Sequence, residues 1–90
     1  MNWLITGGCG FLGTALIAEL VQSQDNNIRV LDNLSVGSKE DLCLVTSFSE
    51  QPRHKLNWLH NNKVSLTVGD ILDENLAYLV SKDADIIVHF

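Results

Sequence analysis

The residues with the strongest chemical signal form a glycine-rich segment, residues 6–13, which reads Thr-Gly-Gly-Cys-Gly-Phe-Leu-Gly. Two spacings overlap in it, because Gly8, Gly10 and Gly13 fit G-x-G-x-x-G, and Gly7 in place of Gly8 gives G-x-x-G-x-x-G. Glycine permits a tight turn after a strand and lets the backbone approach a pyrophosphate. The unpaired N–H groups at the start of a following helix then hold phosphates. The segment therefore predicts a loop that binds the phosphates of a dinucleotide.

An acidic residue stands at the distance that such a loop requires. Asp32 follows the apolar run Ile28–Leu31, about 20 residues after Gly13, where a carboxylate can accept hydrogen bonds from ribose hydroxyls. The same carboxylate would repel a 2′-phosphate, so Asp32 favours NAD over NADP. The alternative is an ordinary tight turn and helix cap, without a ligand.

The pattern of apolar residues predicts the elements that position these groups. Strands are expected at residues 2–6, 28–31, 64–68 and 85–90. Helices are expected at residues 11–24, where leucines recur every four positions, and from the N-cap Asp73 through Val80. With a third helix in the middle of the chain, the order is β-α-β-α-β-α-β, which indicates an α/β fold with a parallel sheet and right-handed crossovers.

The middle of the chain, residues 33–63, is the least regular. Ser38 and Asp41 have the spacing of a capping box, so a helix is expected from Lys39. Three residues should end this helix, namely Ser47, Ser49 and Pro52. A second short helix or turn is expected around Leu56, Trp58 and Leu59. The only basic patch comprises Arg53, His54, Lys55, His60 and Lys63. It is either a solvated surface or a contact with a phosphate or with other parts of the protein.

Composition excludes several classes of protein. The 90 residues are 46% hydrophobic and 19% charged, as in globular domains and unlike disordered chains. A net charge of −5 disfavours binding to nucleic acid or to an anionic membrane, and no apolar run reaches the ~18 residues of a membrane span. The two cysteines fit a reducing cytoplasm. His54 and His60 lack the spacing of metal ligands, so no metal is expected.

Several segments together resemble a known family. Residues 4–13 are similar to the T-G-G-x-G-F-x-G start of extended short-chain dehydrogenases/reductases, and more narrowly of the UDP-galactose 4-epimerase-like, NAD-dependent sugar-nucleotide epimerases and dehydratases. Residues 32–37 resemble the D-N-L-S-x-G of that family, residues 69–71 its G-D-I, and residues 88–90 the start of its V-x-H-x-A-A. The resemblance covers the whole chain in order. It implies a Rossmann-type sheet of which residues 1–90 are the N-terminal, incomplete part.

The resemblance also implies a role for individual residues toward NAD. The pyrophosphate would lie against Gly7, Gly10, Phe11, Leu12 and Gly13. The ribose and the adenine edge would meet Asp32, Asn33 and Ser35, and the adenine ring would meet the Asp70 side chain and the Ile71 amide. Asp70 and Ile71 also follow a predicted parallel strand, at the edge where such sheets bind ligands. By itself, Asp70 could equally be a plain turn residue.

No catalytic residue is predicted within the chain, because the Tyr-x-x-x-Lys pair of the family is expected beyond residue 90. Tyr78 and Lys82 have that spacing, but they lie in the helix before the last strand, so the match is interpreted as chance. The chain ends in an apolar run, which indicates truncation, and we expect it to be inactive alone.

The function implied by the resemblance is the NAD-binding portion of an epimerase or dehydratase that transiently oxidises a sugar hydroxyl. Its partner would be a nucleotide-sugar substrate, and the full-length protein would be a homodimer. The alternative is a non-catalytic NAD(H)-binding or sensing protein on the same fold.

Two further residues have more than one interpretation. Cys9 is either a small residue tolerated between glycines or a thiol activated by a helix N-terminus. His89 is expected to be a core histidine or to bond to the backbone.

Overall fold

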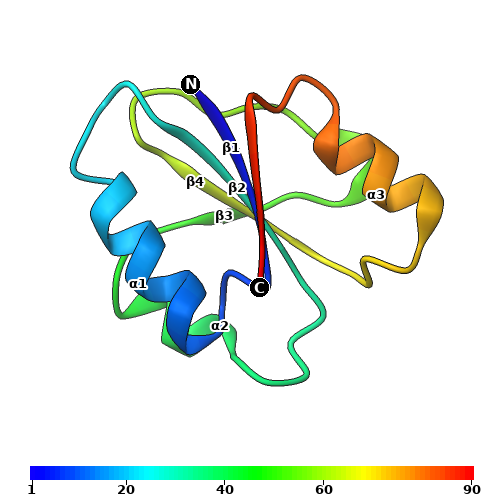
Figure 1. Ribbon diagram of the computed structural model, residues 1–90, viewed down its shortest axis with the longest axis horizontal. Coiled ribbons are helices and arrows are strands. Elements are labelled where there is room, and N and C mark those ends of the chain that lie inside the picture. The colour runs from blue at the N-terminus through cyan, green and yellow to red at the C-terminus, as the bar shows by residue number, and fades with distance from the viewer.

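The computed structural model describes all 90 residues, and a five-stranded parallel sheet lies at its centre (Figure 1). The strands are β1 (Asn2–Thr6), β2 (Asn27–Asp32), β3 (Ser49–Glu50), β4 (Val64–Val68) and β5 (Ile86–His89). The helices are α1 (Phe11–Leu20), α2 (Lys39–Cys43) and α3 (Glu74–Ser81), with a short 3-10 helix η1 (Arg53–Lys55). The strand order is β3-β4-β2-β1-β5. The predicted α/β class, a parallel sheet with flanking helices, is confirmed.

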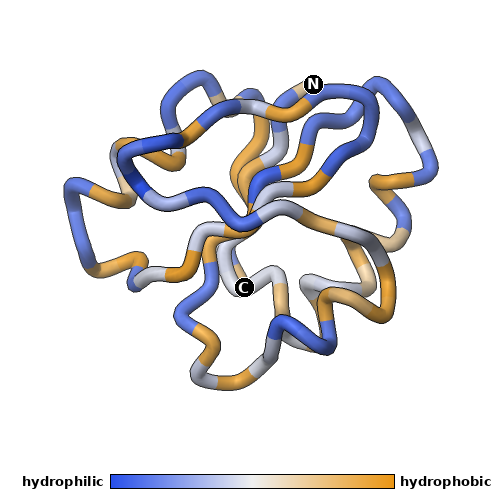
Figure 2. Tube along the Cα trace, turned by 180° about the vertical axis from the view of Figure 1, so that it is seen from behind, coloured by the Kyte–Doolittle hydropathy of each residue, from blue (hydrophilic) through white to orange (hydrophobic).

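Each face of the sheet has its own core, because successive side chains of a strand point to opposite faces. Helices α1 and α2 cover one face and α3 covers the other (Figure 1). The core under α1 and α2 includes Ile5, Ile17, Ile28, Val30, Leu42 and Leu66. The core under α3 consists of Leu4, Leu31, Leu76 and Val80. Full burial of each such side chain contributes about 1.5–3 kcal/mol, and Figure 2 shows the hydrophobic stretches of the central strands.

The register brings the carboxyl ends of four strands to the same edge of the sheet. Thr6 of β1 pairs with Leu31 of β2 and with His89 of β5. Asp32, the last residue of β2, pairs with Val68 of β4. The segments that follow these strands therefore start side by side, which is where parallel sheets bind ligands.

The first helix is shorter than predicted. It was expected to continue to Gln24, but α1 ends at Leu20. The N–H groups of Gln22 and Ser23 switch to acceptors three residues earlier, and the Asn26 side chain donates to the Leu20 carbonyl at 3.1 Å. These bonds close the last carbonyls of the helix in a tight turn.

The helix that begins at Lys39 is confirmed at its start and shorter than predicted at its end. Ser38 and Asp41 form both bonds of a capping box. The helix stops at Cys43, well before the residues expected to end it, and the two-residue strand β3 follows. Two residues carry no periodicity, so β3 had no sequence signal; its pairing with β4 defines it.

The short helix or turn expected around Leu56, Trp58 and Leu59 is displaced. A 3-10 turn forms earlier, at Arg53–Lys55 directly after Pro52, and residues 56–60 are irregular. Tertiary bonds hold this segment, since the Trp58 indole N–H donates to the Lys82 carbonyl at 3.0 Å.

The predicted N-cap of the last helix is confirmed, because the Asp73 carboxylate accepts the Leu76 N–H at 3.1 Å. None of the helices has the length and apolar character needed to cross a membrane.

Candidate functional site

A cleft of about 410 Å³ opens at the carboxyl edge of the sheet. Its walls are the glycine-rich loop, the start of α1, the segment after β2 and the segment after β4. The sequence-predicted cofactor contacts that line it are Gly7, Gly10, Phe11, Leu12, Gly13, Asp32, Asn33, Ser35 and Ile71. The structure thus brings together residues from three separate segments, and only Asp70 of the predicted set lies outside the lining.

The glycine-rich loop turns sharply after β1. Gly7 has a φ of 73°, a conformation that L side chains rarely adopt. Its N–H donates to the Leu31 carbonyl at 2.8 Å, and its own carbonyl accepts the Gly10 N–H at 3.1 Å. The loop is therefore fixed by backbone bonds to β2 and within itself.

Two glycines of the loop serve different purposes. A Cβ on Gly13 would lie 2.5 Å from the Gly8 Cα, so Gly13 allows the helix to pack directly on the loop. A Cβ on Gly10 would meet nothing closer than the Gly7 carbonyl oxygen, at 3.4 Å. A side chain at Gly10 would therefore not clash with the rest of the protein, and it would extend into the cleft.

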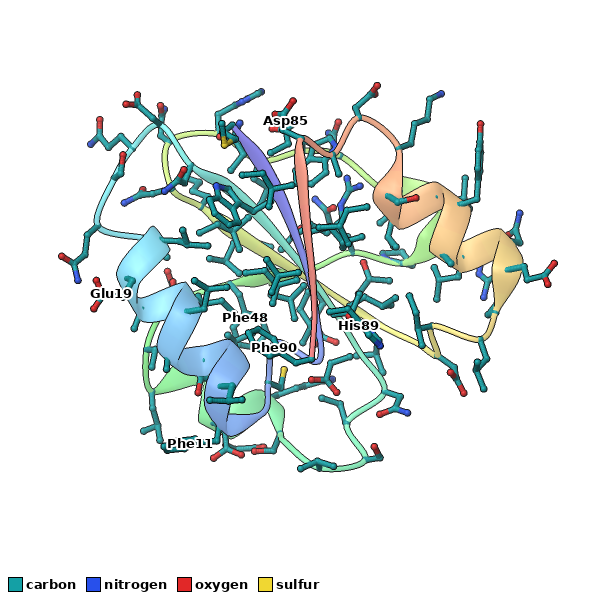
Figure 3. The ribbon with its side chains drawn as sticks, in the orientation of Figure 1. Phe11, Glu19, Phe48, Asp85, His89 and Phe90 are labelled. Carbon is teal, nitrogen blue, oxygen red and sulfur yellow. The ribbon has the colours of Figure 1, made fainter.

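The start of α1 presents free N–H groups to the cleft. Gly10 is the N-cap and offers no side-chain acceptor, and the first turn contains no acidic residue. The Thr14 N–H bonds to the Gly10 carbonyl, but the amides of Phe11 and Leu12 have no acceptor in the protein. Phe11 itself is 88% exposed at the tip of the helix (Figure 3). Free amides and the positive end of the helix dipole favour an anionic group here.

Asp32 is buried where β2 meets the glycine-rich loop. It is 6% exposed, and its two carboxylate oxygens accept the N–H groups of Cys9 at 2.8 Å and Leu34 at 2.7 Å. Each carboxylate oxygen can accept more than one hydrogen bond. The side chain can therefore hold the loop and still accept a hydroxyl from the cleft.

Cys9 is a packing residue. It is 1% exposed and belongs to the core under α1 and α2. Burial, together with the nearby Asp32 carboxylate, raises the pKa of the Cys9 thiol to about 12. The thiolate, which is the nucleophilic form, is therefore absent at neutral pH. The interpretation as a thiol activated by the helix N-terminus is wrong, and that as a small residue between glycines is confirmed.

The segment after β2 closes one side of the cleft. The Asn33 side chain accepts the Ser35 N–H at 3.0 Å, which shapes the turn. A Cβ on Gly37 would lie 2.0 Å from the Cys9 carbonyl oxygen, so only glycine lets this segment lie against the glycine-rich loop. Gly37 was not among the predicted site residues, although its place in the D-N-L-S-x-G motif was a signal for it.

The segment after β4 contributes Gly69 and Ile71 to the lining. Asp70 is used locally, because its carboxylate accepts the Leu72 N–H at 2.9 Å and its carbonyl accepts the Asp73 N–H at 3.0 Å. The structure places Asp70 beside the cleft as a turn residue.

The expectation for His89 is wrong. It is exposed and lines the cleft, and its Nδ1 forms a hydrogen bond with the Thr6 hydroxyl, neither a core contact nor a backbone bond. Within residues 1–90, β5 lies at the edge of the sheet, and none of the helices α1, α2 and α3 covers its carboxyl end. Phe90 also lines the cleft (Figure 3). Tyr78 is 65% exposed on α3, and neither it nor Lys82 lines the cleft.

Comparisons with known proteins agree with this geometry. The model of the 3-beta hydroxysteroid dehydrogenase/isomerase family matches residues 4–90. The low-salt glycan biosynthesis protein Agl12 of Haloferax volcanii is 32% identical over this whole chain, which covers 25% of that protein. The UDP-glucose 4-epimerase of Yersinia enterocolitica is 36% identical over the whole chain, which covers 24% of it. The chain thus spans about a quarter of the length of these curated relatives.

Solved structures give the same result for the fold. A dTDP-glucose 4,6-dehydratase from Bacillus anthracis in complex with NAD superposes with a TM-score of 0.74 at 26% identity, covering 100% of this chain and 26% of that one. The resemblance to sugar-nucleotide epimerases and dehydratases is therefore confirmed by sequence and by structure. The chain belongs to the 3-beta hydroxysteroid dehydrogenase/isomerase family, and its relatives include nucleotide-sugar epimerases and dehydratases.

Proposed function

We propose that residues 1–90 are the NAD-binding, N-terminal part of an NAD-dependent nucleotide-sugar epimerase or dehydratase. The observation that carries the proposal is the cleft at the carboxyl edge of the sheet, where free amides at the start of α1 face the same space as the Asp32 carboxylate. Phosphate oxygens can accept hydrogen bonds from the amides, and ribose hydroxyls can donate to the carboxylate. This pairing fits the adenosine diphosphate half of a dinucleotide.

Residues of the glycine-rich loop would hold the pyrophosphate. The amides of Phe11 and Leu12 would donate to it, and the empty Cβ position of Gly10 would let the phosphates reach the backbone. Gly7 and Gly13 support this role through the turn and the helix packing. The helix dipole offsets part of the repulsion from the overall charge of −5.

Residues after β2 and β4 would hold the adenosine. Asp32 would accept the ribose hydroxyls, with Asn33 and Ser35 at the ribose and adenine edge. The Ile71 backbone would contact the adenine ring. The Leu72 N–H occupies only Oδ1 of Asp70, so Oδ2 could accept from the adenine amino group, as the family resemblance implies, once the side chain turns into the cleft.

When bound, NAD would supply a hydride acceptor for transient oxidation of a sugar hydroxyl. The residues of this chain would bind and orient the cofactor, and the catalytic pair and the sugar contacts would come from residues beyond Phe90. The substrate would be a nucleotide sugar, as the names of the relatives suggest. We further propose a cytoplasmic homodimer for the full-length protein. The free thiols Cys9 and Cys43 support a reducing compartment.

Calorimetric titration of the 90-residue chain with NAD and with ADP tests the binding part of the proposal. Because all the proposed contacts are to the ADP half, the two affinities should agree within about fivefold, less than 1 kcal/mol. Binding of NAD with no binding of ADP would contradict this assignment of the cleft.

Turnover of a nucleotide sugar by the full-length protein tests the catalytic part. NAD binding without turnover of any UDP- or dTDP-sugar would favour the alternative, a non-catalytic NAD(H)-binding or sensing protein.

A further inference from the structure

A second cleft, of about 370 Å³, lies on the α3 face of the sheet. It is bounded by η1, residues 56–58 and the C-terminal end of α3, and it shares no lining residue with the first cleft. Nitrogen donors dominate its charged lining, which consists of Arg29, Arg53, His54 and Lys82 against a single carboxylate, Asp83. In a chain with net charge −5, this is a local excess of positive charge.

Arg29 is the unusual member of this lining. It lies in the middle of β2 and is only 2% exposed. One guanidinium N–H donates to the Val80 carbonyl at 2.9 Å, and the group stacks on the Trp58 ring at 4.1 Å from the centroid. Neither of the two ion pairs in the protein involves Arg29, and its Nε has no hydrogen-bond partner.

A buried cation without a counter-ion is unfavourable, because its lost hydration is not replaced. Burial lowers the pKa of the Arg29 guanidinium, and the nearby Asp83 only opposes this. The neighbour of Arg29 in the sheet register, Ser65, also has a buried hydroxyl without a partner. Stacking on Trp58 stabilises the cation but gives no acceptor to the unpaired N–H. Asp83 is the only carboxylate in the lining and forms no ion pair with Arg29, so the guanidinium has no direct negative acceptor.

The other cations lie at the rim, where they can reach a ligand. Arg53 bonds to Asp73 and Asn75, which uses two of its five N–H groups. Lys82 forms no ion pair. Lys82 follows the last turn of α3, next to Asp83.

We propose that the second cleft binds a phosphate-class oxyanion, which serves as the counter-ion of Arg29 while Arg53 and Lys82 donate to it from the rim. Guanidinium groups suit this ligand because their planar N–H forks match tetrahedral oxyanions. The carboxylate of Asp83 opposes binding. The proposal does not depend on NAD binding, since the two clefts are separate.

Titration of the ¹⁵N-labelled protein with sodium phosphate, against sodium chloride at equal ionic strength, tests the proposal. Saturable amide shifts are expected at residues 53–58 and 79–83, with a binding curve distinct from any shifts at residues 7–13. A parallel titration with AMP identifies whether a free or a nucleotide-borne phosphate binds more tightly at the same amides. Saturable shifts confined to residues 7–13, or none, would overturn the proposal.

Two variants with opposite expected effects on phosphate affinity, and one control variant, separate binding from a structural role. Lys82→Gln should weaken phosphate binding about two- to fivefold, the scale of one exposed charge interaction. Asp83→Asn should tighten it by a similar factor, and the φ of 63° at this position is one that asparagine adopts readily. Lys63→Gln is the matched control, because it removes the same charge outside the cleft. Equal weakening by Lys63→Gln and Lys82→Gln would contradict a specific site.

Discussion

The Asp32 carboxylate accepts the backbone N–H of Cys9 at 2.8 Å, and this bond joins the end of β2 to the middle of the glycine-rich loop. The residue expected to recognise the ribose thus also holds the loop expected to bind the phosphates. One substitution at Asp32 should therefore affect both halves of the cleft.

Asp32→Ala should weaken NAD binding by about 1–3 kcal/mol, because it removes hydrogen bonds to a charged group. Loop damage alone would weaken NAD and NADP equally. Loss of the carboxylate also removes the repulsion of a 2′-phosphate, so the ratio of NAD to NADP affinity should fall. Calorimetry with both cofactors measures the ratio. Unchanged NAD affinity in the full-length protein would show that Asp32 does not contact the ribose.

Gly10→Val should abolish NAD binding without unfolding the protein. A Cβ at Gly10 meets only the Gly7 carbonyl oxygen at 3.4 Å, and a φ of −77° suits any residue. The side chain therefore enters the cleft rather than the core. The melting temperature and NAD copurification are measured together, with Gly10→Ala as the smaller step. A folded valine variant that still copurifies with NAD would mean that the loop does not bind the pyrophosphate.

Gly37→Ala should lower stability as well as affinity. Its Cβ would lie 2.0 Å from the Cys9 carbonyl oxygen, so the segment after β2 must move away from the glycine-rich loop. Such overpacking costs about 1–3 kcal/mol. Denaturant unfolding measures it, and Gly10→Ala, with no comparable clash, is the matched control. Equal stability of the two variants would contradict the packing described here.

The stability of the protein should fall as pH rises from about 9 to 12, in part because of Cys9. Burial and Asp32 raise its pKa from the ordinary 9.0 to about 12, so in this range the folded thiol keeps a proton that the unfolded chain releases. The Cys9 thiol therefore does not lower the free energy of unfolding below pH 9, and it lowers that free energy progressively as the pH approaches 12. Cys9→Ala should therefore have a shallower pH dependence of unfolding above pH 9. Identical slopes for the two proteins would show that the thiol is not protected.

A thiol reagent provides an independent measurement of the same environment. Cys43 is exposed and should react at once, whereas Cys9 should react only on unfolding. Fast modification of Cys9 in the folded Cys43→Ser variant would contradict the pKa assignment.

Local sequence patterns were enough to predict most of the fold. The apolar runs ending at Thr6 and Val68 match β1 and β4 residue for residue, and Asp73 caps α3 as its type and position predict. Strand periodicity and side-chain capping act over a few residues, so the sequence contains them in full. The glycine spacing and the later Asp32 likewise indicated the cleft, because their roles depend on backbone conformation near each residue.

Contacts between distant segments determined the features of the fold and the clefts that the sequence did not predict. β3 exists only through its pairing with β4, and α1 stops at Leu20 because a side chain six residues later bonds to its last carbonyl. Within these 90 residues, the exposed position of His89 follows from β5 being at the edge of the sheet. Arg29 is buried without an ion-pair partner because α3 and Trp58 pack over β2. None of these has a local signal, because burial and bond partners are properties of the assembled sheet and helices.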